Sequence, residues 1–282
     1  MSQQSQGDAL DWAVPIMRAG YAGRGLTYLA IAGISLWAIW SGGSAQGTQS
    51  ALSRLQGTPG GGIVLGLIAI GLIAYCVWRV LDAIFDLEAY GTDGKAIVAR
   101  IGMVVTGLIH AALGIAAFTI LYGTGTGGSG ISGLTRKALD LPMGQFLVGA
   151  GAVATIGAGL YYLKKAVTGD YQDNLQANHF TVNWNWVLKA GVAAQGVIVT
   201  IVGGFFLVAA LTYDASEAGG MDKVFNWLSS QPFGQTIVVV ICLGLLAFAL
   251  FCFVNAAYRI VPRASSEDVE TLAKRVKSKV SD

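Results

Sequence analysis

The sequence predicts an all-α integral membrane protein with six transmembrane helices, arranged as three parallel two-helix repeats. Composition and internal repetition carry this prediction. Of the 282 residues, 54% are hydrophobic and 12% are charged, whereas soluble domains carry roughly 25% charged residues. A chain with so few charges cannot cover a water-exposed surface, which places it among integral membrane proteins.

Six stretches are long and apolar enough to cross a bilayer, which takes about 20 mainly apolar residues. They cover, with approximate ends, residues 21–41, 62–82, 101–122, 143–163, 189–212 and 236–260. The first resembles a secretory signal peptide, because Gly43 and Ala45 form an acceptable cleavage site. We interpret it as a membrane helix, since the stretch recurs twice later in the chain.

One motif begins the first, third and fifth spans: RAGYAGRG at 18–25, RIGMVVTG at 100–107 and KAGVAAQG at 189–196. A Pro-x-Gly pair precedes each remaining span, at Pro59, Pro142 and Pro232. The motif recurs at intervals of 82 and 89 residues (18 to 100 to 189), and the prolines at intervals of 83 and 90 (59 to 142 to 232). Two independent markers therefore indicate the same tandem repeat.

The chain accordingly divides into repeats at residues 1–98, 99–187 and 188–262, followed by a tail at 263–282. Each repeat holds an even number of spans, so all three share one orientation. Parallel repeats are related by an axis along the membrane normal. We therefore expect pseudo-threefold symmetry, with six helices around a common centre.

With AYCVWRVLDA at residues 74–83, the triplicated pattern resembles the bacterial membrane family called domain of unknown function 1206. The resemblance covers about residues 12–262, and the first copy matches best. The later copies carry GLYYLKKA (159–166) and FCFVNAAYR (251–259) at the corresponding place. The resemblance implies a six-helix inner-membrane protein and implies no activity.

Lysine and arginine set the expected orientation, because cytoplasmic loops carry an excess of them. Fourteen of the 18 fall on the face that holds both termini, and four fall on the other face. We therefore expect a multi-pass protein of the bacterial inner (plasma) membrane with both termini in the cytoplasm. On the outer face, apolar segments at 51–55, 134–141 and 224–230 are expected to form short interfacial helices, each ending before its proline.

The tail at 265–282 is predicted to be a basic amphipathic helix capped by Ser265. Its apolar face holds Val269, Leu272, Ala273, Val276 and Val280, and its basic face holds Lys274, Arg275, Lys277 and Lys279. Such a helix suits an anionic membrane surface or a groove on a partner protein. A solvated, fraying tail is the alternative.

Polar residues in membrane helices are costly and are functional hypotheses by default. The intramembrane polar set is Arg24, Arg79, Asp82, Thr106, His110, Lys165, Gln195 and Asn255. We expect these groups near the cytoplasmic interface, apart from His110 at mid-bilayer. On a functional interpretation, these groups form a vestibule, an ion site or a head-group site. On a structural interpretation, they neutralise one another and fix helix order, or they reach to water.

The repeat aligns these residues in sets of three. Asp82, Lys165 and Asn255 each lie 23 residues after a loop proline, so they are expected to form a ring around the pseudo-axis. An Arg24–Asp82 ion pair within the first repeat is the alternative.

His110 is expected to donate to a carbonyl on a neighbouring helix or to relay protons. No Asp or Glu lies in the middle of a span, which argues against proton-driven transport. Glu88 and its acidic neighbours in the loop at 86–95 are interpreted as solvated.

No catalytic constellation or metal-ligand spacing is present in the sequence, and Cys76, Cys242 and Cys252 lie in apolar runs. A G-x-G-x-x-G string at 123–128 is interpreted as a flexible linker rather than a cofactor motif, because no strand precedes it. A net charge of +2 is too small to predict nucleic-acid binding. We therefore expect a non-enzymatic accessory or scaffold protein that binds lipid or another membrane complex, or that forms a homo-oligomer. A small channel or transporter along the pseudo-axis is the alternative.

Overall fold

The computed structural model describes residues 12–123, 130–262 and 270–281. Six of its helices are long and apolar enough to cross a membrane: α2 (Ala13–Trp40), α4 (Gly61–Phe85), α5 (Gly94–Leu121), α7 (Gly144–Thr168), α9 (Asn185–Thr212) and α11 (Gly234–Tyr258). The six predicted spans are confirmed, and the chain is a multi-pass membrane protein. Several helices extend beyond the apolar windows, most of all α2, which begins at Ala13 rather than near residue 21.

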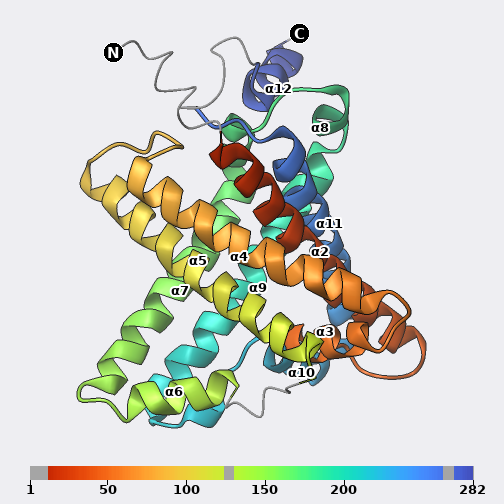
Figure 1. The fold of residues 1–282 in the computed structure, drawn as a ribbon, viewed down its shortest axis with the longest axis vertical. Helices are drawn as coiled ribbons and strands as arrows, with labels where there is room; N and C mark the ends of the chain where they lie inside the picture. The colour runs from red at the N-terminus through yellow and green to blue at the C-terminus, as the bar shows by residue number, and fades with distance from the viewer. Residues whose placement is uncertain (1–11, 124–129, 263–269, 282) are drawn as a thin grey trace.

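Three short helices lie at the end of the bundle opposite the start of α2 (Figure 1). They are α3 (Thr48–Gln56), α6 (Ile131–Leu139) and α10 (Met221–Ser229), and each ends before its proline as predicted. Each Pro-x-Gly then begins the next long helix. An added Cβ at Gly61 would overlap the carbonyl of Leu55, and Gly144 and Gly234 lie equally close to carbonyls of the preceding short helix. Only glycine fits this turn, which explains the second repeated landmark.

All but one of the remaining elements lie at the end where α2 begins, which we call the terminal end (Figure 1). They are η1 (Asp170–Asn174), α8 (His179–Asn183) and α12 (Leu272–Ser281), while η2 (Ala215–Glu217) lies at the opposite end. In the described residues the β structure is limited to two isolated bridges, Leu175 to Arg259 and Gln176 to Thr271.

The tail forms a helix, α12, but Glu270 and Thr271 lie outside it although the prediction placed them inside. On its apolar face Leu272 and Ala273 are buried and Val276 is half-buried. Leu272 is fully buried against Tyr171 and Leu175, so it is not available to a bilayer or a partner groove as predicted. The basic residues Lys274, Arg275 and Lys277 stay exposed. Ser265, Val269 and the side chains of Lys279 and Val280 lie outside the described residues.

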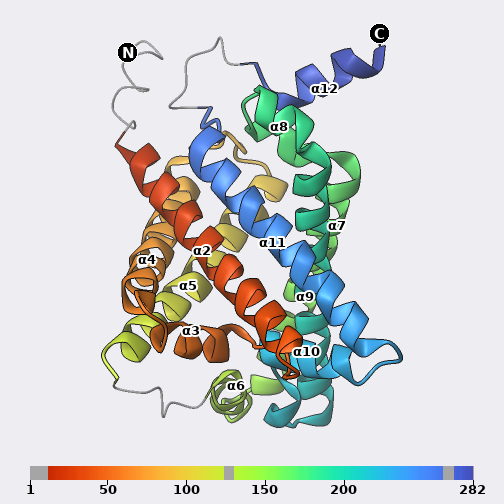
Figure 2. The same ribbon diagram turned by 90° about the vertical axis from the view of Figure 1, so that its right-hand side faces the viewer.

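The long helices pack in a consistent order between repeats. The second helix of each repeat packs against the first helix of the next, giving the pairs α4–α5 and α7–α9, and α11 returns to pack against α2 (Figure 2). Within the first and third repeats, α2 also packs against α4 and α9 against α11. Within the second repeat, α5 and α7 barely touch.

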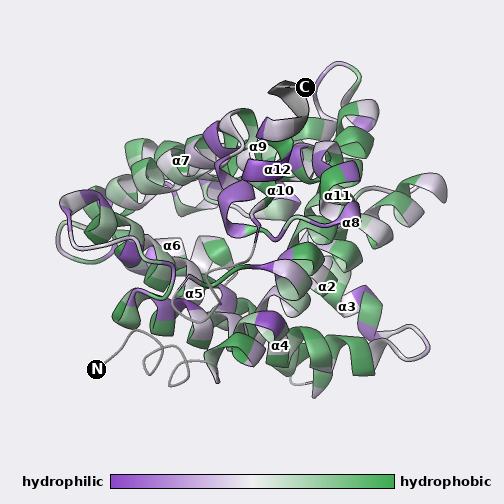
Figure 3. Ribbon diagram, turned by 90° about the horizontal axis from the view of Figure 1, so that it is seen from above, coloured by the Kyte–Doolittle hydropathy of each residue, from purple (hydrophilic) through white to green (hydrophobic). Residues whose placement is uncertain are grey.

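The bundle is therefore an open arc in the order α5, α4, α2, α11, α9, α7 rather than a closed ring. Seen from above, α4 and α5 lie on one side and α7 and α9 on the other, joined through α2 and α11 (Figure 3). The expected pseudo-threefold symmetry is not confirmed, because one of the six helix interfaces that it requires is not formed.

Candidate functional site

The last glycine of each repeated motif packs the repeats together. An added Cβ at Gly25 would meet the ring of Phe253 on α11. The equivalent Gly107 faces Cys76 and Arg79 on α4, and Gly196 faces Leu163 on α7. Because a glycine lets two helices approach closely, this position accounts for all three interfaces between repeats.

The first glycine of the motif behaves differently in the second repeat. A Cβ added to Gly20 would lie 2.6 Å from the Cα of Tyr75. A Cβ added to Gly191 would lie 2.5 Å from the carbonyl carbon of Ala247. At the equivalent Gly102 it would meet nothing within 4 Å. The interface within a repeat is therefore closed in the first and third repeats and open in the second.

Equivalent side chains show the same contrast. Thr27 is 4% exposed and Ile198 is 2% exposed, whereas Ile109 at the same place on α5 is 55% exposed. On the short helices, Ala51 and Val224 are fully buried, whereas Leu134 on α6 is 63% exposed. The second repeat therefore keeps the sequence pattern of the other two, but its equivalent side chains are exposed rather than buried.

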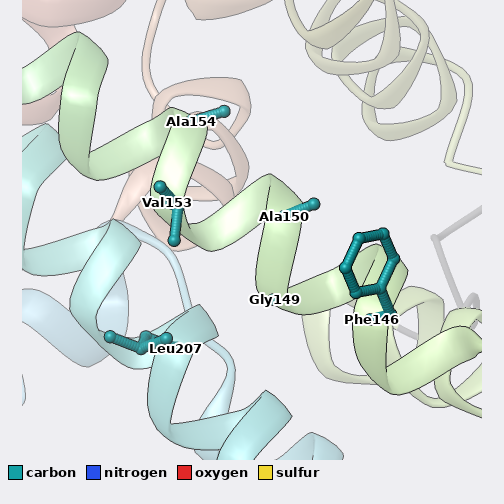
Figure 4. A pocket seen from close by; sticks show the side chains of 6 residues that line it. All are labelled: Phe146, Gly149, Ala150, Val153, Ala154 and Leu207. Carbon is teal, nitrogen blue, oxygen red and sulfur yellow. The ribbon is translucent and has the colours of Figure 1, made fainter.

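We call the uncovered surface between α5, α6 and α7 the open seam. Its defining residues are Gly102, Val105, Ile109, Leu134, Ala154 and Ala158, all of them exposed and uncharged. Beside it, on the α7–α9 side, lies a shallow hollow of about 530 Å³. Figure 4 shows its lining: Phe146, Gly149, Ala150, Val153, Ala154 and Leu207. The hollow contains no charged side chain and shares Ala154 with the seam.

Inside the arc, Arg24 occupies the middle of α2. It lies eleven residues after Ala13, or about 16 Å along the helix axis, and is 3% exposed. The apolar window, which began near residue 21, placed Arg24 about one turn into its helix, whereas in the structure it lies about three turns in because α2 begins at Ala13. Its Nη1 donates to the hydroxyl of Tyr75 at 2.8 Å, and its guanidinium lies 4.6 Å from the Tyr75 ring centroid and 5.5 Å from that of Phe248.

Arg24 does not pair with Asp82, so that alternative is wrong. Asp82 lies seven residues beyond Tyr75 on α4, about 10 Å further along the helix, and there it pairs with Arg79 at 3.4 Å. Among the described residues no ion pair involves Arg24, and its buried Nε has no hydrogen-bond partner.

A cavity of about 60 Å³ lies beside Arg24. Its lining is Arg24, Thr27, Tyr28, Ile31, Thr48, Leu72, His110, Leu113 and Met221. The Oη of Tyr28 accepts a hydrogen bond from Gln195 at 3.0 Å. The structure thus brings together Arg24, His110 and Gln195 of the predicted polar set. Thr106 is half-buried and donates to the carbonyl of Gly102.

His110 does bond to a carbonyl, but on its own helix rather than on a neighbouring one. Its Nδ1 lies 2.7 Å from the carbonyl oxygen of Thr106. A carbonyl can only accept, so Nδ1 carries the hydrogen and Nε2 is left as an acceptor. The ring also lies 4.7 Å from that of Tyr75, which places His110 beside Arg24.

At the terminal end, a buried charge cluster joins the first and third repeats. Arg259 Nη2 lies 2.6 Å from Glu88 Oε1, and Arg79 lies 3.9 Å from the same oxygen. Burial pushes the pKa of Glu88 upward, but the charges of Arg259 and Arg79 outweigh it and hold the pKa below its usual range. Asn255 joins the cluster by accepting from Arg259 Nη1 at 2.6 Å.

The predicted ring of Asp82, Lys165 and Asn255 is wrong as a set of direct contacts. Asp82 bonds to Arg79, and Asn255 bonds to Arg259. Lys165 is half-buried, with its Nζ 5.3 Å from the Tyr161 ring centroid. The interpretation of Glu88 as a solvated loop acid is also wrong, since its side chain is 1% exposed. Its neighbour Asp86, interpreted in the same way, is also buried, at 5% exposure. Carboxylates in a loop with several acidic residues gave no signal of that burial.

Comparison with known proteins agrees with the repeats. A profile of the family described as Domain of Unknown Function (DUF1206) matches residues 19–86, 101–169 and 190–259. A relative described as "Uncharacterized protein YxxB", from Bacillus subtilis (strain 168), is 26% identical over 252 residues, covering 88% of this chain and 92% of the relative. No solved structure was found to match. Neither description names an enzymatic activity, and the three tandem matches, which span most of the sequence, show that the chain belongs to the DUF1206 family.

Proposed function

We propose that the protein is a non-enzymatic membrane protein that holds lipid acyl chains in the open seam between α5 and α7. The observation that carries the proposal is the exposure of seam positions that are buried in the sister repeats. Ile109 is 55% exposed, whereas Ile198 is 2% exposed.

The occupant follows from the chemistry of the seam. At membrane depth the neighbouring molecules are lipid tails, which are as apolar as leucine side chains, so burial alone does not favour any one partner. Shape provides the preference, because a chain lying against Gly102, Ala154 and Ala158 can approach the helix backbones and gain many weak dispersion contacts. A protein partner or a second copy of this chain, in place of lipid, is an outcome that the test below distinguishes.

A channel along the pseudo-axis has less support. Tyr75, Trp78 and Phe248 are each fully buried within the arc, so large side chains fill the bundle around Arg24. We further propose the bacterial inner membrane with both termini in the cytoplasm, which is supported by the 14-to-4 division of Lys and Arg between the two faces.

The experiment uses Ile109→Trp to fill the seam and Ile115→Trp as its control. Both isoleucines lie on α5 with similar exposure, 55% and 58%. Ile115 aligns with Gly33 and Gly204, where an added Cβ meets nothing within 4 Å, so it lies on the outer side of the bundle. Native mass spectrometry after gentle extraction measures the lipid retained by each variant.

We expect the wild type and Ile115→Trp to retain lipid, and Ile109→Trp to lose it. Equal retention by all three would reject the proposal. Release of a protein partner, or loss of a dimer mass, in Ile109→Trp alone would show that the seam holds protein instead.

A further inference from the structure

We infer that Arg24 and the small cavity beside it form a binding site for a carboxylate. This inference goes beyond the proposed lipid seam and does not depend on it. The cavity lies within the arc of helices, and the two sites share no defining residue.

The first step is the charge of Arg24. Arg79 and Arg259, whose side chains are 15% and 8% exposed, both lie against carboxylates, those of Asp82 and Glu88. Arg24 is more deeply buried, at 3% exposure, yet no ion pair to it occurs in the described part of the chain. A buried charge is costly unless it is paired and hydrogen-bonded. The aromatic rings of Tyr75 and Phe248 offset part of that cost and leave the positive charge without a counter-ion.

The second step is the set of donors. The Nε of Arg24 is buried and has no partner. The Tyr28 oxygen accepts from Gln195, so the Tyr28 hydroxyl retains its own hydrogen to donate. Both residues line the cavity. The two oxygens of a carboxylate match two such donors, and charge-assisted bonds of this kind are the stronger ones. His110 leaves an acceptor and adds no donor for an anion.

The third step is the size of the cavity. It measures about 60 Å³, and a single water needs roughly 10–15 Å³ on the same measure. A carboxylate fits, and a whole phospholipid head group does not. The carboxylate can belong to a small free acid or to the head of a fatty acid that enters from the bilayer.

The test titrates sodium acetate and sodium octanoate into the full-length protein in a neutral detergent. Sodium sulfate at equal ionic strength is the reference, and thermal unfolding is the measurement. We expect a carboxylate to raise the unfolding midpoint of the wild type above that in sulfate, because a ligand that binds only the folded state stabilises it. If acetate stabilises the protein, a small free acid is sufficient as the ligand. If only octanoate stabilises it, the ligand is a fatty acid.

Arg24→Gln installs the residue found at the equivalent Gln195, so the fold has a precedent for it. We expect this variant to bind the carboxylate at least about ten-fold more weakly, as loss of a charged hydrogen bond predicts. Arg18→Gln removes the same charge from an exposed position on α2 and is expected to bind normally. Tyr28→Phe provides a second weakened variant in case Arg24→Gln does not fold.

Absence of any carboxylate-specific shift in the wild type would overturn the inference. Unchanged binding in Arg24→Gln would also overturn it, as would unchanged binding in Tyr28→Phe if Arg24→Gln does not fold. Ile109→Trp is expected to keep acetate binding, so failure of the lipid seam and failure of this site are separate results.

Discussion

The first and second repeats begin with the same motif and pack it differently. Gly20 lies against the backbone of Tyr75 on α4, whereas Gly102 faces empty space where α7 would be in a closed ring. One turn further on, Gly23 meets Gly71 in the first repeat and Ala194 meets Gly244 in the third. The second repeat carries Val105 and Ala154 at those positions.

This comparison separates two roles of the repeated glycines. The last glycine of each motif supports the contact between repeats and works in all three copies. The first glycine supports the contact between the two helices of a repeat only when the residue one turn further on is also small. The second repeat has Val105 where the other repeats have glycine or alanine, and a larger side chain keeps two helices from close approach. The open seam therefore lies in the repeat with the bulkier residue at this position.

The largest expected effect is on the closed side of the arc, where Glu88 connects the first repeat to Arg259 of the third. Glu88→Gln leaves two buried guanidinium groups without their shared carboxylate, and we expect a loss of about 3–5 kcal/mol in unfolding free energy. The matched control is Glu270→Gln, whose exposed pair with Arg275 is worth roughly 0–1 kcal/mol. Denaturant unfolding in mixed micelles measures both, and similar small losses would show that the cluster does not secure the closed side.

The next effect compares equivalent positions on the closed and open sides. Gly71→Leu would force a side chain into the backbone of Gly23, where an added Cβ already lies 2.6 Å from Cα. We expect a loss of about 1–3 kcal/mol or more from this overpacking. Ala154→Leu at the equivalent open position is expected to change stability by about 0.5 kcal/mol or less. Equal losses would contradict an open seam.

A smaller effect is expected from pH. Because the pKa of Glu88 is lower in the folded protein than its usual value, the stability that it contributes is present above the unfolded pKa. That stability is lost as the pH falls through the folded pKa. When the unfolding free energy is measured from neutral to acidic pH, it should therefore decline once the pH falls below the usual pKa range of glutamate. Glu88→Gln should remove this part of the decline, and an identical profile in that variant would contradict the assignment.

The sequence predicted the elements better than their arrangement. Hydrophobic windows located all six spans, and the short apolar segments before the loop prolines located the three short helices. The early start of α2 was missed because Ala13 to Gly20 include a proline and an arginine, which lower the apolar signal without breaking a helix at its first turn. That error placed Arg24 about one turn, rather than about three turns, into its helix.

The burial of Glu88 depends on backbone geometry that composition does not reveal. After α4 the chain turns through Asp86 and Ala89, which have φ angles of 52° and 56°. This turn folds the loop back so that the N–H of Glu88 donates to Asp82. The open seam was likewise beyond prediction, since Val105 differs from Gly23 and Ala194 by a few methyl groups and only the packed structure shows the consequence.

Cysteine cross-linking tests the central claim, the open seam, most directly. In a background with Cys76, Cys242 and Cys252 replaced by alanine, one variant carries Ala194→Cys and Gly244→Cys, and a second carries the equivalent Val105→Cys and Ala154→Cys. A disulfide requires Cα atoms within about 7 Å. Oxidation in membranes should cross-link the 194–244 pair and leave the 105–154 pair as free thiols. Equally fast cross-linking of both pairs would show that the second repeat closes like the others and would contradict the account.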